Sequence, residues 1–261
     1  MLISIITVTL NDLDNLALTA KSLASQTNKD FQWIIKDGLS VDGTEKYVEE
    51  IRTLYDVDYI RKKDISIYDA MNQAIPYAKG KYSIFLNAGD ILADENTISK
   101  AIGILSKTNS SFAFGSNYDS TIDGDMLFKK ARSLDYLKHS LPTSHQAIFY
   151  NTTLFETYRY PLEYRICGDY AFTARIFFDG VQDYVTLNFP VCIFKLGGVS
   201  QENRKLLLKE GYIIHRTIVK NNRVSASLKY VKRFLTMHAF DHTPKLYGLM
   251  WKLFEKWNNA V

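Results

Sequence analysis

Three aspartates of this 261-residue chain each follow a segment that favours a β-strand. Asp37 follows "FQWIIK" at 31–36, Asp64 lies in the loop after "DVDYI" at 56–60, and Asp90 ends "KYSIFLNAGD" at 81–90. The carboxyl ends of parallel strands meet at one edge of a sheet, where open α/β folds bind their ligands. We therefore expect these carboxylates to share one edge.

A cluster of carboxylates repels an anionic ligand unless a divalent cation lies between them. Mg²⁺ and Mn²⁺ are commonly held by a few protein carboxylates together with phosphate oxygens of the ligand. The sequence contains no GxxxxGK[ST] motif, and no GxGxxG follows the first predicted strand. The pattern therefore favours a nucleoside diphosphate bridged to the protein by a metal.

Simpler interpretations exist for most of these side chains. Asp90 and Asp169 could each cap a following helix, at about 95 and 169–178, and His145 could be a polar residue beside a strand. Asn72 falls three residues after Asp69 on one predicted helix face, a spacing that is also typical of a solvated surface. A ligand site is indicated by the convergence of Asp37, Asp64 and Asp90 on one edge of the predicted sheet.

Strand-like and helix-like segments alternate through the first 107 residues, and this alternation predicts a parallel sheet. The expected strands are 2–9, 31–36, 56–60 and 82–86, and the expected helices are 13–26, 44–55, one from about 66, and 95–107. Strands at 110–118, 146–151 and 184–194 and a helix at 168–178 indicate a mixed region up to about 200. Residues 201–261 are expected to be mostly helical.

Composition and charge limit the class of protein. With 46% apolar residues the chain can build a sizeable core, and it has no run of eighteen apolar residues. We expect neither a signal peptide nor a spanning helix, and hence a cytoplasmic protein. Cys167 and Cys192 lack metal-binding spacing, so we expect two buried hydrophobic residues. Residues 201–261 hold twelve Lys or Arg against four Asp or Glu, and nothing in the chain resembles a nucleic-acid-binding module.

Four segments of the sequence together resemble the bacterial family-2 inverting glycosyltransferases of the GT-A fold, which build capsule, O-antigen and exopolysaccharide. They are "SIITVTLND" at 4–12, "SLASQTNKDFQWIIKDGLSVDGT" at 22–44, "DISIYDAMNQAIPYAKGKYSIFLNAGD" at 64–90 and "GGVS" at 197–200. The resemblance implies an α/β catalytic domain at 1–200, with a nucleotide-sugar part at about 1–107 and an acceptor part at about 108–200. A basic amphipathic helical extension at 201–261 would follow it.

The resemblance also implies roles for particular residues. Asp90 would be the remaining carboxylate of a DxD-type motif and hold Mn²⁺ or Mg²⁺, and Asp169 in "CGDYAF" would be the general base. His145 precedes a predicted strand and, apart from the resemblance, could either contact the diphosphate, the metal or the acceptor or be only a polar residue beside that strand. The implied nucleotide-sugar-binding residues are Thr7, Thr9, Asn11, Asp37, Asp64, Asn72 and Asn87.

The sequence departs from the pattern of these relatives at three points. The metal motif is Asn87-Ala88-Gly89-Asp90, with one acid where many relatives have two. Ser66 stands where relatives often have glycine, and Leu39 lies in a turn that usually contains smaller residues.

The activity implied by the resemblance is transfer of a sugar from a UDP-sugar to a saccharide or polyprenyl-diphosphate-linked saccharide. The alternatives are an inactive nucleotide-sugar-binding partner in a polysaccharide assembly complex and a sugar-nucleotide pyrophosphorylase. Lysines and arginines interleave with apolar residues at 228–235 and 245–257, which favours an amphipathic helix on an anionic membrane at the inner face of the cell membrane. Such a face could equally pack on the protein's own domain.

Overall fold

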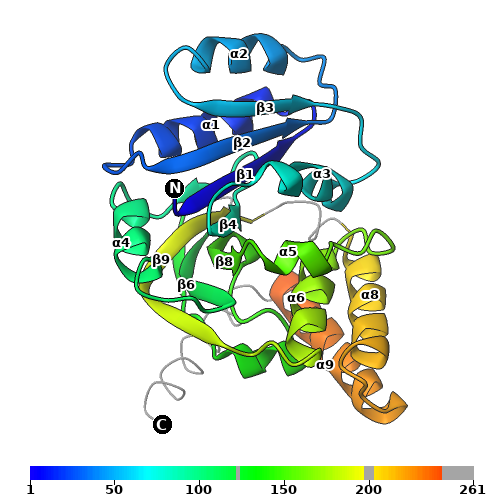
Figure 1. Ribbon diagram of the computed structural model, residues 1–261. Coiled ribbons are helices and arrows are strands. Elements are labelled where there is room, and N and C mark those ends of the chain that lie inside the picture. Colours follow the sequence, from blue (N-terminus) through cyan, green and yellow to red (C-terminus); the bar gives the residue numbers. More distant parts are fainter. Residues whose placement is uncertain (122–123, 197–202, 243–261) are drawn as a thin grey trace. The chain divides into compact units, whose positions relative to one another are not determined.

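The computed structural model describes residues 1–121, 124–196 and 203–242 (Figure 1). Its contacts divide the chain into two units, Met1–Asn203 and Arg204–Val261. The expected "GGVS" segment at 197–200 and the tail beyond residue 242 lie outside the described residues.

The first unit is built on a sheet in the order β3-β2-β1-β4-β8-β6-β9-β5, with β7 paired to β6. The strands are β1 (Ile3–Thr9), β2 (Phe31–Asp37), β3 (Val57–Arg61), β4 (Tyr82–Phe85), β5 (Ile91–Leu92), β6 (Phe112–Ser120), β7 (Met126–Lys129), β8 (Ile148–Asn151) and β9 (Tyr184–Lys195). The first four strands run parallel, as the alternation of elements predicts. Beyond β4 the sheet is mixed, because β8 joins β4 and β6 antiparallel while β9 runs parallel to β6.

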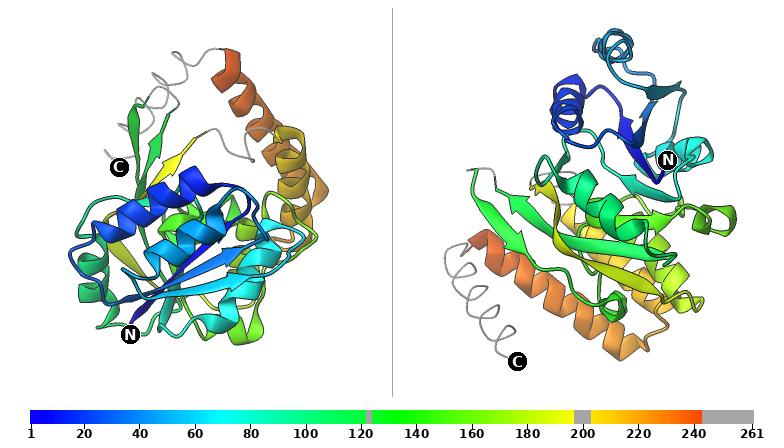
Figure 2. Two further views of the ribbon diagram at one scale, coloured as in Figure 1. Left: turned by 90° about the horizontal axis from the view of Figure 1, so that it is seen from above. Right: turned by 60° about the vertical axis from the view of Figure 1, so that its left-hand side comes forward.

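Helices cover both faces of the parallel half, and the right-hand view of Figure 2 shows α1 and α3 on opposite sides of the strands. The helices of this unit are α1 (Leu13–Ala24), α2 (Thr44–Ile51), α3 (Ile67–Ala74), α4 (Thr97–Leu105), α5 (Leu154–Thr157) and α6 (Gly168–Phe178). Short 3₁₀ turns occur at η1 (Ile75–Tyr77), η2 (Leu134–Lys138) and η3 (His145–Ala147).

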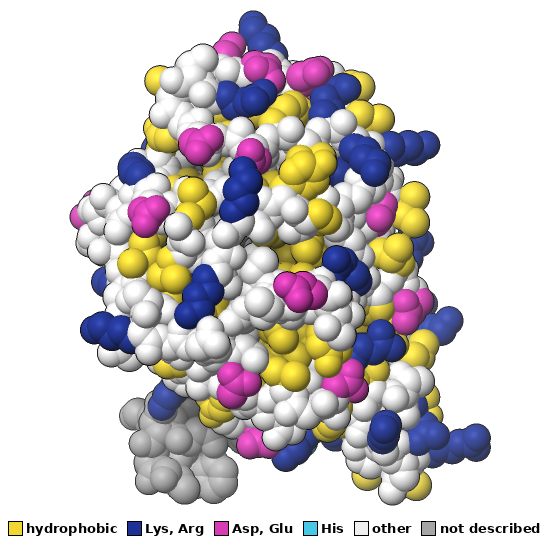
Figure 3. All heavy atoms as spheres, viewed as in Figure 1, with side chains coloured by type: hydrophobic (Ala, Val, Ile, Leu, Met, Phe, Trp, Pro, Cys, Tyr) yellow, Lys and Arg dark blue, Asp and Glu magenta, His cyan; other side chains and the backbone are white. Residues whose placement is uncertain are grey.

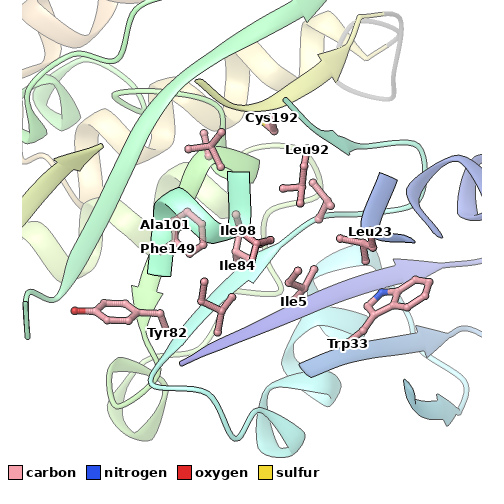
Figure 4. Packing of buried hydrophobic residues seen from close by; sticks show 14 of the residues in the cluster. Ile5, Leu23, Trp33, Tyr82, Ile84, Leu92, Ile98, Ala101, Phe149 and Cys192 are labelled. Atoms are coloured by element: carbon pink, nitrogen blue, oxygen red, sulfur yellow. The ribbon is translucent and has the colours of Figure 1, made fainter. Parts of the chain in front are cut away.

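One hydrophobic core lies between the sheet and helices α1, α2 and α4 (Figure 4). Ile5 and Ile84 from adjacent strands pack there with Leu23 of α1 and Ile98 of α4, and all four are at most 2% exposed. Successive side chains of a strand point to opposite faces. The other face therefore receives a separate, mainly aromatic set.

Rings from distant segments form that aromatic set. Tyr160 stacks on Phe172 of α6 at 4.3 Å between ring centroids, and it meets Phe85 of β4 edge-on at 5.2 Å. Tyr68 of α3 stacks on Tyr160 at 5.6 Å. Such pairs add roughly 0.5–1.5 kcal/mol each beyond their buried area, and they join α3 and α6 on this face of the sheet.

The second unit contains α8 (Arg204–Thr217) and α9 (Arg223–His242). Its α9 carries an exposed apolar stripe of Val224, Leu228, Val231 and Leu235, which are 49–70% exposed. Figure 3 shows Lys and Arg side chains gathered around the lower ends of these helices. None of the helices among the described residues is long and apolar enough to cross a membrane.

Candidate active site

The carboxyl ends of β1 to β3 meet at one edge, as the sequence predicts for the aspartates. Thr9 and Asp37 are partners in the register of β1 and β2, and Asp37 and Arg61 are partners in that of β2 and β3. Asn87 and Asp90 follow the end of β4, which is parallel to β1. A recess lined by Gly80, among others, lies at the opposite ends of these strands and includes none of the predicted site residues.

Asp90 is buried, with 7% of its surface exposed. Its Oδ2 accepts hydrogen bonds from the side-chain Nε2 of Gln146 at 3.0 Å and from the backbone N–H of Asn87 at 3.2 Å. Oδ1 accepts none from the described residues. Burial raises the pKa of Asp90 to about 7, against the opposing effect of these two donors. This carboxylate is therefore costly to ionise while no cation is beside it.

The sequence does not single out Gln146, although it is 4% exposed and touches Asp90. In this segment only its neighbour His145 is a residue type that suggests a functional site. A buried glutamine next to a strand cannot be recognised from the local sequence. The backbone brings the two residues onto η3, directly before β8 pairs with β4.

Asp37 is entirely buried and its oxygens are occupied within the protein. Oδ1 accepts from the backbone N–H of Ser40 at 2.8 Å and from its hydroxyl at 2.6 Å. Oδ2 accepts from the hydroxyl of Tyr59 at 2.8 Å, and Nε of Arg61 lies 3.6 Å away. These bonds shape the loop at 38–43.

Asn11 closes the same loop from the β1 side. Its backbone N–H donates to the Ser40 hydroxyl at 2.8 Å, and its Oδ1 accepts from the backbone N–H of Val41 at 2.8 Å. Asn11 has φ 50°, in the left-handed region that asparagine tolerates better than most residues. Leu39 also lies there, at φ 75°, and its side chain is 39% exposed. The turn therefore accommodates Leu39 by turning it outward.

Asp64 is held by a buried lysine, Lys36, that no pattern in the sequence indicates. Nζ of Lys36 donates to Oδ2 of Asp64 at 2.7 Å and to the carbonyl oxygens of Lys62 at 2.6 Å and Asp37 at 3.2 Å. The Lys36 side chain is 0% exposed and that of Asp64 is 9% exposed. This ion pair joins the end of β2 to the loop that leads into α3.

Two of the predicted nucleotide contacts have internal partners instead. The hydroxyl of Thr7, which is 0% exposed, donates to the Leu86 carbonyl at 2.8 Å and accepts from the Trp33 indole N–H at 3.0 Å. The Asn72 amide donates to the carbonyl of Tyr160 at 2.8 Å and accepts from its N–H at 2.9 Å. Both residues fix backbone segments of the protein through these bonds, and their contact with a nucleotide stays a prediction.

Thr9 and Asn87 behave differently. Oγ1 of Thr9 and Oδ1 of Asn87 are buried and have no hydrogen-bond partner among the described residues. Buried polar atoms in folded proteins are nearly always paired. These two atoms are therefore candidates for contact with a bound molecule.

Asp169 occupies the first turn of α6, where Gly168 allows a close approach to α3. A Cβ on Gly168 would lie 2.5 Å from Cε2 of Tyr68. Oδ1 of Asp169 accepts from the backbone N–H of Tyr170 at 2.8 Å, and the Tyr68 hydroxyl lies 3.4 Å from it. Oδ2 faces Nδ1 of His145 at 3.7 Å. The carboxylate thus has one held oxygen and one that remains for chemistry.

His145 has one ring nitrogen toward Asp169 and one without a partner. Its Nε2 is buried and makes no hydrogen bond within the described part of the chain. Burial lowers the pKa of His145, against the opposing charge of Asp169. A neutral imidazole beside a carboxylate is suited to exchange or direct a proton.

The residues present fit a cation that is shared with a ligand. Among the residues that the structure describes, no group of three or more His, Cys, Asp or Glu side chains is placed to hold a metal ion. A cation bound through the phosphates of a nucleotide needs only one or two protein carboxylates. Asp90, with Oδ1 uncommitted, meets that requirement.

Solved structures share this fold and define its class as GT-A. TarS from S. aureus, residues 1–349 in complex with UDP-GlcNAc, aligns with a TM-score of 0.65 at 17% identity over 94% of this chain and 74% of that chain. The mannosyltransferase PcManGT from Pyrobaculum calidifontis, in complex with GDP-Man and Mn²⁺, aligns with a TM-score of 0.65 at 14% identity over 92% of this chain and 70% of that chain.

Residues 4–184 match the model of glycosyl transferase family 2, and the chain belongs to that family. It is 32% identical over 184 residues to a PGL/p-HBAD biosynthesis glycosyltransferase of Mycobacterium bovis, covering 67% of this chain and 69% of the relative. It is 24% identical over 252 residues to the E. coli UDP-Glc:alpha-D-GlcNAc-diphosphoundecaprenol beta-1,3-glucosyltransferase WfgD. This match covers 92% of this chain and 96% of the relative. The protein is thus a glycosyltransferase, and the pyrophosphorylase alternative is not retained.

Proposed function

We propose that the protein is an inverting, metal-dependent glycosyltransferase that uses a UDP-sugar. The observation that carries the proposal is the convergence of two carboxylates on one turn. Asp90 follows β4 and Asp169 lies in the first turn of α6. They are contacted by consecutive residues of η3, Gln146 and His145. An electrophilic site and a base at one place are what a single displacement at an anomeric carbon requires.

In this reaction an acceptor hydroxyl oxygen bonds to the anomeric carbon while the bond to the diphosphate oxygen breaks. The hydroxyl proton passes to Oδ2 of Asp169, and the nucleoside diphosphate leaves with the electron pair. The Tyr170 N–H, 2.8 Å from Oδ1, orients the carboxylate for that transfer. A positioned general base contributes about 10²- to 10⁴-fold to the rate.

Asp90 would hold Mn²⁺ or Mg²⁺ together with the donor phosphates. The cation, when bound, supplies positive charge to the leaving diphosphate. The buried oxygens of Thr9, the last residue of β1, and of Asn87, which follows β4, are the proposed polar contacts of the nucleotide sugar. Asn11, Asp37 and Asp64 support the nucleotide by shaping the loops at 38–43 and 62–64.

The choice of UDP rests on the relatives. The name of WfgD specifies UDP-Glc, and the TarS complex contains UDP-GlcNAc, whereas PcManGT was solved with GDP-Man. The acceptor of WfgD is a sugar on diphosphoundecaprenol. We therefore propose a saccharide or polyprenyl-diphosphate-linked saccharide as acceptor, in the biosynthesis of a capsule, O-antigen or related polysaccharide.

Such an acceptor lies at a membrane, and α9 offers a means to approach it. The helix has the exposed apolar stripe described above, and its sequence carries Arg223, Lys229, Lys232 and Arg233. An apolar stripe beside cations favours the interface of an anionic bilayer. We propose that the protein is cytoplasmic and peripheral at the inner face of the cell membrane.

The test is thermal denaturation with UDP, GDP, dTDP and CMP, each with and without Mn²⁺. Ligands that bind only the native state raise the melting temperature. UDP with Mn²⁺ should give the largest shift, and Asp90→Asn should remove its metal-dependent part. A full metal-dependent shift in Asp90→Asn would exclude Asp90 as the ligand, and binding without transfer from any UDP-sugar would favour the inactive binding partner.

A further inference from the structure

The turn η3 (His145–Ala147) contacts both carboxylates of the proposed site through adjacent side chains. Gln146, 4% exposed, donates from Nε2 to Oδ2 of Asp90 at 3.0 Å. His145 places Nδ1 3.7 Å from Oδ2 of Asp169. Asp90 and Asp169 lie far apart in the sequence, and this turn is next to both of them.

The turn is held firmly by the strands around it. The N–H of Ala147 donates to the carbonyl of Ser144 at 2.9 Å, and β8 begins at the next residue between β4 and β6. From β6, the Oδ1 atom of Asn117, which is 0% exposed, accepts from the Thr143 hydroxyl at 3.2 Å and the Ser144 N–H at 3.4 Å. Because the turn is anchored on both sides, it can fix the orientation of the two carboxylates that its side chains contact.

The chemistry of the two side chains suits different tasks. An amide Nε2 only donates, so Gln146 favours the ionised carboxylate of Asp90 and occupies one oxygen. The N–H of Asn87 binds that same oxygen at 3.2 Å, so both donors leave Oδ1 uncommitted. The Tyr170 N–H holds Oδ1 of Asp169, and Nδ1 of His145 faces Oδ2. A carboxylate oxygen has two lone pairs, so Oδ2 can accept from His145 and still take the proton of the acceptor hydroxyl.

We propose that η3 is a positioning element in which Gln146 sets the metal-binding carboxylate of Asp90 and His145 sets the base carboxylate of Asp169. The inference rests on the proposed function, since it assigns tasks to the partners of those two aspartates. The 3.7 Å separation of His145 from Asp169 is expected to shorten in the substrate complex, because catalytic hydrogen bonds are often long in ligand-free proteins.

Substitutions of Gln146 and His145 should therefore affect different measured quantities. A Gln146 substitution should weaken metal-dependent UDP binding, and a His145 substitution should lower kcat. Gln146→Met keeps the side-chain size and removes the donor, and it should weaken Mn²⁺-dependent UDP binding by about 10- to 100-fold, as loss of an outer-shell partner does. Its affinity for UDP without metal should stay within about twofold of that of the unmodified protein. Calorimetric titration with UDP, with and without Mn²⁺, measures both quantities.

His145→Leu should leave both UDP affinities within about twofold and lower kcat about tenfold or more at saturating donor, because the base loses its orienting donor. His145→Asn keeps a donor near the position of Nδ1 and should recover most of kcat. If His145 had only a structural role, His145→Asn would not recover kcat. The His145 and Gln146 variants would then also not divide into one that lowers kcat and one that lowers metal-dependent UDP affinity.

Gln26→Met is the matched control, because Gln26 is also buried, at 2% exposure, and donates to the Asp94 carbonyl at 2.8 Å, away from both aspartates. It should lower the melting temperature and leave UDP·Mn²⁺ affinity unchanged. If Gln146→Met fails to fold, Gln146→Asn decides, since its amide is one methylene too short to reach Asp90.

Unchanged UDP·Mn²⁺ affinity in a folded Gln146 variant would overturn the proposal. Equal losses of the same parameter in the Gln146 and His145 variants would overturn it as well. Asp90→Asn separates this failure from that of the proposed function: if Asp90→Asn loses the metal effect and Gln146→Met keeps it, only the positioning role is wrong. If both keep it, the metal site itself is wrong.

Discussion

Asp90 is a carboxylate that the fold removes from water and holds through one oxygen. The sequence identifies it correctly as the acid at the end of a buried strand, because "YSIF" is apolar on both faces and the chain turns directly after it. The sequence does not identify Gln146, since the contact between them depends on the antiparallel pairing of β8 with β4. Long-range pairing of this kind has no local signal.

The raised pKa of Asp90 predicts a pH dependence of the metal-free protein. Its pKa is about 7 in the folded protein and about 3.9 when unfolded. Between these values the folded state binds a proton that the unfolded state does not, so the stabilisation is complete below about pH 4 and is lost as pH rises through about 7. The free energy of unfolding should fall by up to roughly 4 kcal/mol from this group.

Urea unfolding at several pH values in the presence of a chelator measures this decline. Asp90→Asn, which cannot titrate, should remove most of it, whereas the exposed Asp30→Asn should not. The same pH dependence in Asp90→Asn and in the unmodified protein would contradict the account of Asp90.

The Lys36–Asp64 ion pair gives a second prediction. Removing one partner of a buried pair leaves an uncompensated charge and typically costs about 3–5 kcal/mol. We expect Lys36→Met to lower the free energy of unfolding by about this amount and to weaken UDP binding. The double variant Lys36→Met/Asp64→Asn should recover part of the loss, because no buried charge remains, and simple additivity of the two single variants would argue against a coupled pair.

Helices and strands of the first 107 residues are predicted well because their apolar patterns are regular. The helix expected at 44–55 ends earlier, at Ile51, because Arg52–Tyr55 form turns that bond back to Val48, Glu50 and Ile51. The strands β5 and β7 are not predicted at all. Ile91–Leu92 is only two residues long and is defined by its pairing with β9, so nothing local distinguishes it.

The position of Asp169 at the start of α6 depends on the close packing of Gly168 against Tyr68, which the sequence pattern does not predict. Gly168 has no room for a Cβ beside the Tyr68 ring, with contacts of 2.5 and 2.6 Å. Gly168→Ala should therefore cost about 1–3 kcal/mol, as overpacking does, and should lower transfer because the adjacent base moves. Thermal unfolding and transfer assays measure the two effects.

Gly103→Ala in α4 is the matched control. A Cβ there would meet no atom within 4 Å, so the change should stabilise the helix by about 0.5–1 kcal/mol. Equal effects of the two substitutions would show that the contact between Gly168 and Tyr68 does not constrain α6.

At the scale of the whole molecule, the proposed contact of α9 with an anionic membrane can be tested by substitutions on its apolar stripe. Leu228 and Leu235 are 65% and 58% exposed on the apolar stripe. Leu228→Glu/Leu235→Glu should reduce sedimentation with anionic vesicles several-fold at low salt, because it removes apolar contact and adds repulsion. Val41→Glu, at an 88% exposed position of the first unit, is the control and should bind as the unmodified protein does. Equal sedimentation of all three proteins would exclude this face of α9 as the membrane contact.

The proposed activity depends on Asp169 as the group that accepts the acceptor's proton. The most direct measurement compares kcat of Asp169→Asn with that of the unmodified protein, using the donor selected by the nucleotide screen, while calorimetry follows UDP·Mn²⁺ binding. We expect kcat to fall by about 10²-fold or more and the affinity to stay within about twofold, because asparagine keeps the shape but cannot take the proton. A kcat within a few-fold of the unmodified value would contradict the account and leave Asp169 as a residue that only begins α6.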